Sequence, residues 1–226
     1  MKNFALVTGI IALLAAGVWA ADLDAKEFTA GPNIVTSPGY DDTRELIWDN
    51  GGGRWWLAWY TGAGSWVGND FDISTIKTYG GIKFIRYRTS PTWPNTGWDG
   101  FRFGVYSFAG GIPGSMMWPT SGGGYFFVPT GPEGWKECAV TWVLPSGVRK
   151  FVAAMEQFYN NPNCDPYIVD STTVFCGHCW QYYEGAWSEH QGYQGYKNVG
   201  LRVVIDNEQN PAVIPMSAGR VKALYY

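Results

Sequence analysis

The sequence has few charged residues and no excess of positive ones. Charged residues make up 15% of the 226-residue chain, against about 25% in an ordinary globular domain. Lys and Arg total 16 while Asp and Glu total 19, so the formal net charge is −3. A chain without a basic patch lacks the electrostatic footprint that nucleic acid requires. We therefore expect no nucleic-acid partner.

Long apolar runs are absent after residue 20. Before that point, Lys2 precedes an apolar run over 4–18, and Ala20 places a small residue ahead of the bond to Ala21. This pattern is typical of a secretory signal peptide, and the run is too short for a permanent membrane span. We predict a signal peptide over 1–20 and no membrane span after its cleavage. The expected location is secreted or extracytoplasmic, in the periplasm or at the cell surface.

Helical periodicity is also missing, whereas aromatic residues reach 17% and glycines number 30. Aromatic and β-branched residues favour pleated strands, and glycine and proline favour turns. The chain is therefore expected to be all-β, an antiparallel β-sandwich of the jelly-roll kind. We predict a lead-in over 21–38 and a single sandwich domain over 39–226. The predicted strands are 45–48, 54–60, 81–89, 101–108, 125–128, 138–144, 148–158, 167–176, 201–205 and the C-terminal 220–225.

Alternation within these strands predicts which side chains share a face. In 81–89 it groups Ile82, Phe84 and Arg86, and in 101–108 it sets Tyr106 opposite the apolar face. The strands 138–144 and 148–158 flank a Pro-Ser-Gly turn, which predicts a hairpin. In 54–60 both faces carry large apolar residues, which a single core does not easily accommodate.

Several short motifs resemble jelly-roll modules of secreted bacterial surface proteins, many of which have no assigned activity. They are PGYDD at 38–42, IWDNGG at 47–52, FGVY at 103–106, GIPG at 111–114 and the ending GRVKALY at 219–225. The resemblance implies a sandwich fold and export. It carries little information on activity.

Four cysteines are present, and two of them belong to a distinctive motif, CGHC at 176–179. The motif is identical to the active-site tetrapeptide of protein disulfide isomerases, so thiol–disulfide exchange is one alternative. However, 180–185 makes a poor helix and no βαβ pattern precedes the motif. In an exported chain we expect structural disulfides instead, with three pairings open. A zinc site formed by Cys176, His178 and Cys179 with His190 or Cys164 is a third alternative. The expected disulfide residues are Cys138, Cys164, Cys176 and Cys179.

No catalytic centre is evident, and we predict that the chain is not an enzyme. Only two histidines are available as general bases. No serine elbow, phosphate loop or fixed pair of carboxylates appears. The candidate carboxylates are Asp49, Asp70, Asp72, Asp99, Glu184 and Glu189. No cofactor is expected, although Asp41-Asp42 and Asp70-x-Asp72 could hold a structural calcium ion.

The excess of aromatic residues in turn-rich segments is the feature that points to a ligand. Aromatic rings stack on the apolar face of a sugar, and neighbouring polar groups bind its hydroxyls. We therefore predict a module that binds carbohydrate or another surface polymer. The alternatives are a structural or adhesive subunit that pairs through exposed strand edges, and a thiol–disulfide oxidoreductase. The oligomeric state stays open. The predicted aromatic platform is Trp93, Trp98, Trp180, Tyr182, Tyr183 and Trp187.

Overall fold

The computed structural model describes residues 22–28, 43–74 and 81–206. These residues form fourteen strands and no helix, and every strand pair is antiparallel, which confirms the all-β prediction. None of the described segments is a helix long and apolar enough to span a membrane. The predicted signal peptide and the predicted strand 220–225 lie outside the described residues.

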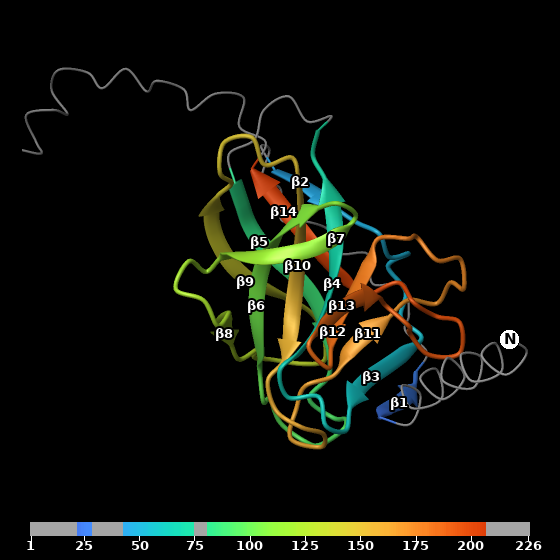
Figure 1. The fold of residues 1–226 in the computed structure, drawn as a ribbon. Helices are drawn as coiled ribbons and strands as arrows, with labels where there is room; N and C mark the ends of the chain where they lie inside the picture. The colour runs from blue at the N-terminus through green and yellow to red at the C-terminus, as the bar shows by residue number, and fades with distance from the viewer. Residues whose placement is uncertain (1–21, 29–42, 75–80, 207–226) are drawn as a thin grey trace, which may run out of the picture.

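The strands form three sheets (Figure 1). The seven-stranded sheet has the order β13-β12-β4-β10-β6-β7, with β8 also pairing with β6. Its strands are β4 (Ser65–Asp72), β6 (Phe101–Ala109), β7 (Ile112–Trp118), β8 (Tyr125–Phe127), β10 (Lys150–Gln157), β12 (Cys179–Tyr183) and β13 (Ala186–Glu189). The four-stranded sheet has the order β2-β14-β5-β9, with β2 (Thr43–Leu46), β5 (Gly81–Thr89), β9 (Gly134–Val143) and β14 (Leu201–Asp206). The third sheet has the order β1-β3-β11, with β1 (Leu23–Glu27), β3 (Trp55–Trp59) and β11 (Tyr167–Val169).

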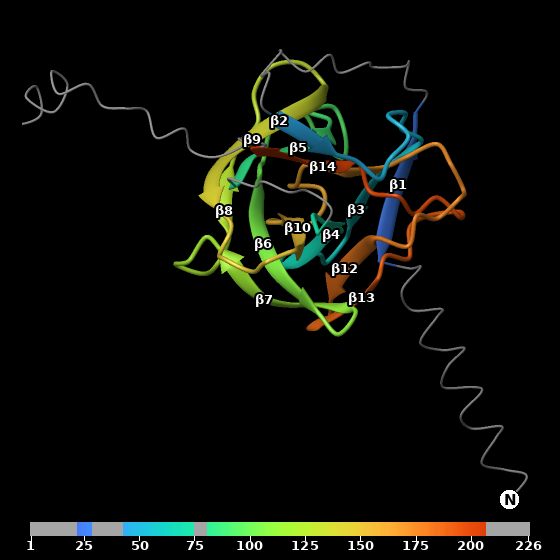
Figure 2. The same cartoon turned by 90° about the horizontal axis from the view of Figure 1, so that it is seen from above.

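The two larger sheets enclose one core. Strands β4, β5 and β6 alternate between the sheets, as do β9 and β10, so the chain crosses the core repeatedly. Val67 and Phe71 from β4 and Phe103 from β6 meet Ile85 from β5 and Val203 from β14 in this core. Figure 2 shows the four-stranded sheet across the top of the molecule and the seven-stranded sheet curving below it. The predicted sandwich is therefore a large curled sheet packed against a smaller one.

The predicted hairpin over 138–158 is wrong. Strand β9 pairs with β5 in the four-stranded sheet, whereas β10 lies between β4 and β6 in the seven-stranded sheet. The reason is burial. Seven of the eight residues of β10 are buried, so this strand needs a neighbour on each side and cover on both faces. Strand β9 exposes Glu137, Ala139 and Thr141, which suits a sheet with one face in solvent.

The alternation predicted for 81–89 is broken by a bulge. The pairing of β5 with β9 shifts between Ile82 and Phe84. After the shift Ile85 and Tyr87 enter the core, while Phe84 is half-buried. An extra residue in one strand moves the following side chains to the opposite face. Strand β6 keeps the predicted alternation, with Phe101, Phe103 and Val105 in the core.

Strand β3 resolves the apparent conflict of a segment with two apolar faces. Trp55, Leu57 and Trp59 face the main core. Trp56 is also buried, because Phe28 stacks on its indole with ring centroids 4.4 Å apart. Phe28 follows β1, which lies within the predicted lead-in and pairs with β3.

His190 is a buried histidine held by two hydrogen bonds. Its Nδ1 lies 2.8 Å from the Lys197 carbonyl oxygen, so it carries the proton, and its Nε2 lies 3.3 Å from the Tyr167 hydroxyl. The ring also packs edge-on against Tyr167. Burial lowers the pKa of His190 to about 4. The neutral imidazole thus fastens the segment after β13 to the core.

We expect His190→Gln to change the pH dependence of stability. The unfolded imidazole takes up a proton near pH 6.5 and the folded one only near pH 4, so the wild type loses stability as pH falls through this window. The free energy of unfolding of the wild type, relative to the variant, should drop by roughly 3 kcal/mol between pH 7 and pH 4. Urea unfolding at several pH values measures this difference.

A difference between two proteins is needed because two buried carboxyls act in the opposite direction. Burial raises the pKa of Asp165 and of Asp170 to about 6. Their contribution to stability therefore falls as pH rises from about 4 to 6. The contribution of these two carboxyls is the same in the wild type and in the variant, so it cancels in the difference between their free energies of unfolding. A relative stability that does not change with pH would contradict the neutral buried state of His190.

Candidate functional site

The outer face of the seven-stranded sheet carries a second aromatic cluster. Alternation along β4 and β6 sends Val67 and Phe103 into the core and leaves Trp66 and Tyr106 on the outer face. Trp187 from β13 joins them. The outward residues of β10, Val152 and Ala154, form the floor of this cluster.

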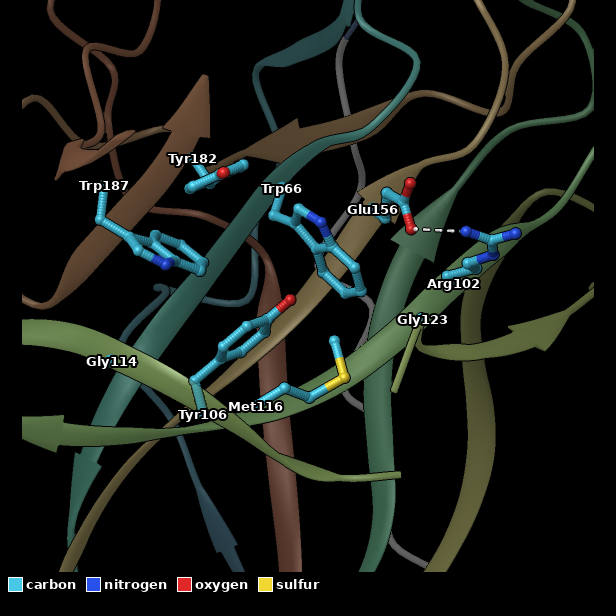
Figure 3. A pocket seen from close by; sticks show the side chains of 9 residues that line it. All are labelled: Trp66, Arg102, Tyr106, Gly114, Met116, Gly123, Glu156, Tyr182 and Trp187. Atoms are coloured by element: carbon cyan, nitrogen blue, oxygen red, sulfur yellow. Dashed lines mark ion pairs between the residues drawn. The ribbon is translucent and has the colours of Figure 1, made fainter. Parts of the chain in front are cut away.

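The rings meet edge to face around a cavity (Figure 3). Tyr106 lies with its ring centroid 5.4 Å from that of Trp66 and 5.1 Å from that of Trp187. Tyr182 lies 5.4 Å from Trp187 on the neighbouring strand. We call the resulting cavity, of about 380 Å³, the aromatic groove. Its lining residues are Trp66, Arg102, Tyr106, Gly114, Met116, Gly123, Glu156, Tyr182 and Trp187.

Glycine in the floor allows this close approach of rings. A Cβ on Gly104 would lie 3.1 Å from both the Tyr106 ring and the Met116 methyl group, and 3.2 Å from the Trp66 ring. A Cβ on Gly68 would lie 2.2 Å from the Ala153 carbonyl oxygen. Larger residues at either position would force strands or rings apart.

One end of the aromatic groove is charged. Arg102 lies 3.6 Å from Glu156, and its guanidinium stacks on the Phe158 ring at 4.1 Å. Burial raises the pKa of Glu156, and the nearby Arg102 opposes part of that rise. A donor and an acceptor thus stand beside an apolar floor, a combination suited to a ligand with both polar and apolar faces.

A second, more polar pocket adjoins the aromatic groove. It has a volume of about 300 Å³ and shares Tyr182 with the groove. Its remaining lining residues are Thr61, Ala63, Gly64, Ser65, Tyr183, Glu184 and Gly185. Since Ser65 and Trp66 are adjacent in β4, the two cavities follow one another along the sheet.

The predicted aromatic platform is divided by the structure. Tyr182 and Trp187 line the aromatic groove, while Trp180 lies beside it, packed against Phe108. Tyr183 packs into the edge of the main core, borders the second pocket and donates its hydroxyl hydrogen to Asp22.

Trp93 and Trp98 lie elsewhere, in the connection between β5 and β6. The Trp98 indole donates to the Gly131 carbonyl oxygen and packs under the Lys136 ammonium group. The sequence therefore identifies part of the groove, on β12 and β13, and adds two tryptophans from another region.

The candidate set omitted Trp66, Tyr106, Met116, Arg102 and Glu156. Trp66 belongs to β4, a strand that was not predicted. Gly62, Gly64 and Gly68 lie in or next to it, and glycines at this spacing are typical of turns. Tyr106 was expected on the outward face of its strand, and that signal could have marked it as a surface residue.

The four cysteines are thiols in this structure. The sulfur atoms of Cys176 and Cys179 lie 3.4 Å apart. Cys138 and Cys164 are buried, and burial raises the pKa of each to about 12. The predicted disulfide bonding of the four residues stays a prediction.

The alternative metal sites are not assembled in the part of the chain that the structure describes, where no three His, Cys, Asp or Glu side chains are grouped to hold an ion. His178 forms a hydrogen bond to Asp70 instead, in which Nδ1 lies 2.8 Å from Oδ2, and its ring stacks on Trp48. Asp70 also accepts a bond from the Trp180 indole, and Asp72 pairs with Lys150. Asp41 and Asp42 lie outside the described residues.

Comparison with known proteins gives a likeness of fold. No protein-family profile matches the sequence, and no curated protein matches it. Among solved structures, the cysteine protease and lectin-like domains of Cwp84, a surface layer associated protein of Clostridium difficile, align with a TM-score of 0.54 at 13% identity. The fold resembles that of the lectin-like domain.

The alignment covers 76% of this chain and 37% of the Cwp84 chain. A second structure, of clostridial Cwp84 after propeptide cleavage, aligns with a TM-score of 0.48 at 13% identity, covering 76% and 42% of the two chains. The match therefore spans less than half the length of either solved chain. At this identity the comparison concerns the fold alone.

We expect Arg102→Met to make the protein more sensitive to alkaline pH. Without the guanidinium, the pKa of Glu156 should rise further, because burial then acts unopposed. A carboxyl with a raised folded pKa loses its contribution to stability as pH rises above its unfolded value, 4.5. At pH 8 the loss should be about 1–2 kcal/mol, since Arg102 is partly exposed.

Thermal unfolding at pH 5 and pH 8 measures this effect. The control is the double variant Arg102→Met/Glu156→Gln, which carries no ionisable group at position 156 and should lose the extra pH dependence. An equal effect of Arg102→Met at both pH values would show that the ion pair contributes nothing to the pH response.

Proposed function

We propose that the protein is a non-catalytic, extracytoplasmic surface module that binds carbohydrate in the aromatic groove. The observation that carries this proposal is the convergence of Trp66, Tyr106, Tyr182 and Trp187, from four different strands, on one cavity beside an Arg–Glu pair. Neighbouring strands of one sheet hold these side chains in a rigid arrangement.

The chemistry of the lining suits a sugar. A pyranose ring has an apolar face of C–H groups and a rim of hydroxyls, so it stacks on aromatic rings and hydrogen-bonds at its edge. Trp187 and Tyr182 supply rings on one side, and Arg102 and Glu156 supply a donor and an acceptor. A volume of about 380 Å³ falls within the usual range for small-ligand sites.

The adjoining polar pocket supports an oligosaccharide or polymer as the ligand rather than a single sugar. Both cavities border Tyr182, so a chain of rings could cross this side chain from one cavity to the other. The second cavity offers Ser65, Thr61 and Glu184 as partners for hydroxyl groups.

The lining favours binding over hydrolysis. Glycosidases commonly use two carboxylates that flank the scissile bond. Of the described residues that line the aromatic groove, Glu156 is the one carboxylate. Its Arg102 partner holds it in an ion pair.

Two observations support a location at the cell surface. The N-terminal segment has the pattern of a secretory signal peptide. The structurally similar Cwp84 is described as a surface layer associated protein. Both are consistent with a module that meets polymers of the cell envelope.

Glycan binding can be tested on an array of bacterial cell-wall and capsular oligosaccharides, followed by titration calorimetry of each ligand found. Trp187→Ala and Tyr182→Ala should each weaken binding by roughly tenfold, the loss of about 1.4 kcal/mol of stacking. Trp98→Ala is the matched control, because this tryptophan lies outside the groove and should leave affinity unchanged.

Two results would contradict the proposal. One is the absence of binding to any glycan on the array. The other is binding that Trp98→Ala abolishes and Trp187→Ala does not. Concentration-dependent assembly without sugar binding would instead favour a structural or adhesive subunit.

A further inference from the structure

A pair of thiols lies at the start of β12, outside both cavities. Cys176 and Cys179 place their sulfur atoms 3.4 Å apart. Gly177 makes this approach feasible, since its φ of +76° is a left-handed conformation that turns the chain back. A Cβ at that position would meet nothing within 4 Å, so the turn itself lies open to solvent on this side.

The scaffold holds both cysteines from the same neighbouring segment. The backbone N–H of Cys176 donates to Asn198 Oδ1 at 2.9 Å, and the backbone N–H of Val199 donates to the Cys179 sulfur at 3.4 Å. Asn198 also donates to Asp170 and to the Val174 carbonyl oxygen. The backbone of Cys176 and the sulfur of Cys179 are therefore both held by hydrogen bonds to the adjacent residues Asn198 and Val199.

The two thiols differ in exposure and in ionisation. Cys176 is partly exposed, while Cys179 is 1% exposed. Hydrogen bonds to the Cys176 sulfur, first from Cys179 and then from the backbone N–H of His178, lower the pKa of Cys176. Burial raises the pKa of Cys179 well above its usual value. An accessible thiol with a lowered pKa beside a buried thiol with a raised pKa is the arrangement that favours thiol–disulfide exchange.

We propose that Cys176 and Cys179 are a redox-active pair that exchanges with external disulfides, in which Cys176 attacks and Cys179 resolves. This goes beyond the proposed sugar site and is independent of it. The proposal also differs from the prediction that all four cysteines form structural disulfides, because in this proposal Cys138 and Cys164 remain thiols.

The exchange balances with a disulfide R–S–S–R as the oxidant. The Cys176 thiolate attacks one sulfur, the R–S–S–R bond breaks, and RS⁻ leaves and takes up the proton of Cys179. The Cys179 sulfur then attacks the Cys176 sulfur of the mixed disulfide, and the second RS⁻ leaves and is protonated by solvent. The pair loses two electrons and becomes a disulfide, while R–S–S–R is reduced to two thiols.

The test is a redox titration of the full chain as exported. Reduced protein is equilibrated at pH 7 in buffers of varied ratio of reduced to oxidised glutathione, quenched with acid, alkylated and mapped by mass spectrometry. A Cys176–Cys179 disulfide should form progressively across the ratios. Cys138 and Cys164 should be alkylated only after unfolding. In the native reduced protein, Cys176 should react with iodoacetamide at least about tenfold faster than either of them.

Variants separate the two roles. Cys179→Ser should accumulate a mixed disulfide of Cys176 with glutathione, because the resolving thiol is gone, and Cys176→Ser should form neither product. Cys138→Ala is the matched control and should behave as the wild type.

The wild-type titration alone can overturn the proposal. It does so if no Cys176–Cys179 disulfide forms at even the most oxidising glutathione ratio, or if the disulfide stays closed in the most reducing buffer. Glycan binding is read out separately, so the failure of one proposal leaves the other standing.

Discussion

Burial of the central strand β10 on both of its faces is the constraint on which the structure depends. Its inward residues Phe151, Ala153 and Met155 fill the main core, and its outward Val152 and Ala154 pack in one cluster with Trp66 and Tyr106 of the aromatic groove. A strand of this kind needs a neighbour on each side and cover over both faces. Strands β4 and β6 supply the neighbours, and the four-stranded sheet covers the inner face.

The outer face is covered in a different way, by aromatic side chains instead of another layer. Rings as large as indole and phenol shield the small floor residues without filling the space between themselves. The cavity exists because aromatic side chains cover this face of the sheet. Rigid rings in edge-to-face contact leave gaps between them that flexible aliphatic side chains would fill. The Arg102–Glu156 pair closes one end, where a buried carboxylate needs a cation close by.

Strand β12 links the candidate groove and the thiol pair. It begins with Cys179, whose sulfur accepts a bond from the Val199 N–H, and continues to Trp180 and Tyr182 beside the cavity. Asp70 on β4 binds Trp180 and His178 together, so the turn that carries the thiols and the first half of β12 are fastened to the same neighbouring strand. The aromatic groove and the thiol pair, which differ in chemistry, are thus both positioned by strand β12.

The sequence by itself determined the class of the fold and most of the strands of the four-stranded sheet. Turn residues and alternation are local signals. They place 81–89 and 201–205 in this sheet's strands and 101–108 in a strand of the seven-stranded sheet, although a bulge interrupts the alternation of 81–89. The sequence also selected Tyr182 and Trp187, which line the aromatic groove. It could not reveal the strand partners, because β9 and β10 look like a hairpin until the burial of β10 on both faces assigns it to another sheet.

Only the tertiary structure brought Trp66, Tyr106, Arg102 and Glu156 to the same cavity and left Trp93 and Trp98 outside it. These groove residues come from β4, β6 and β10, which lie far apart in the sequence. Their proximity depends on sheet order, and sheet order is set by which faces must be buried. That balance of burial is a property of the whole chain, so no local pattern records it.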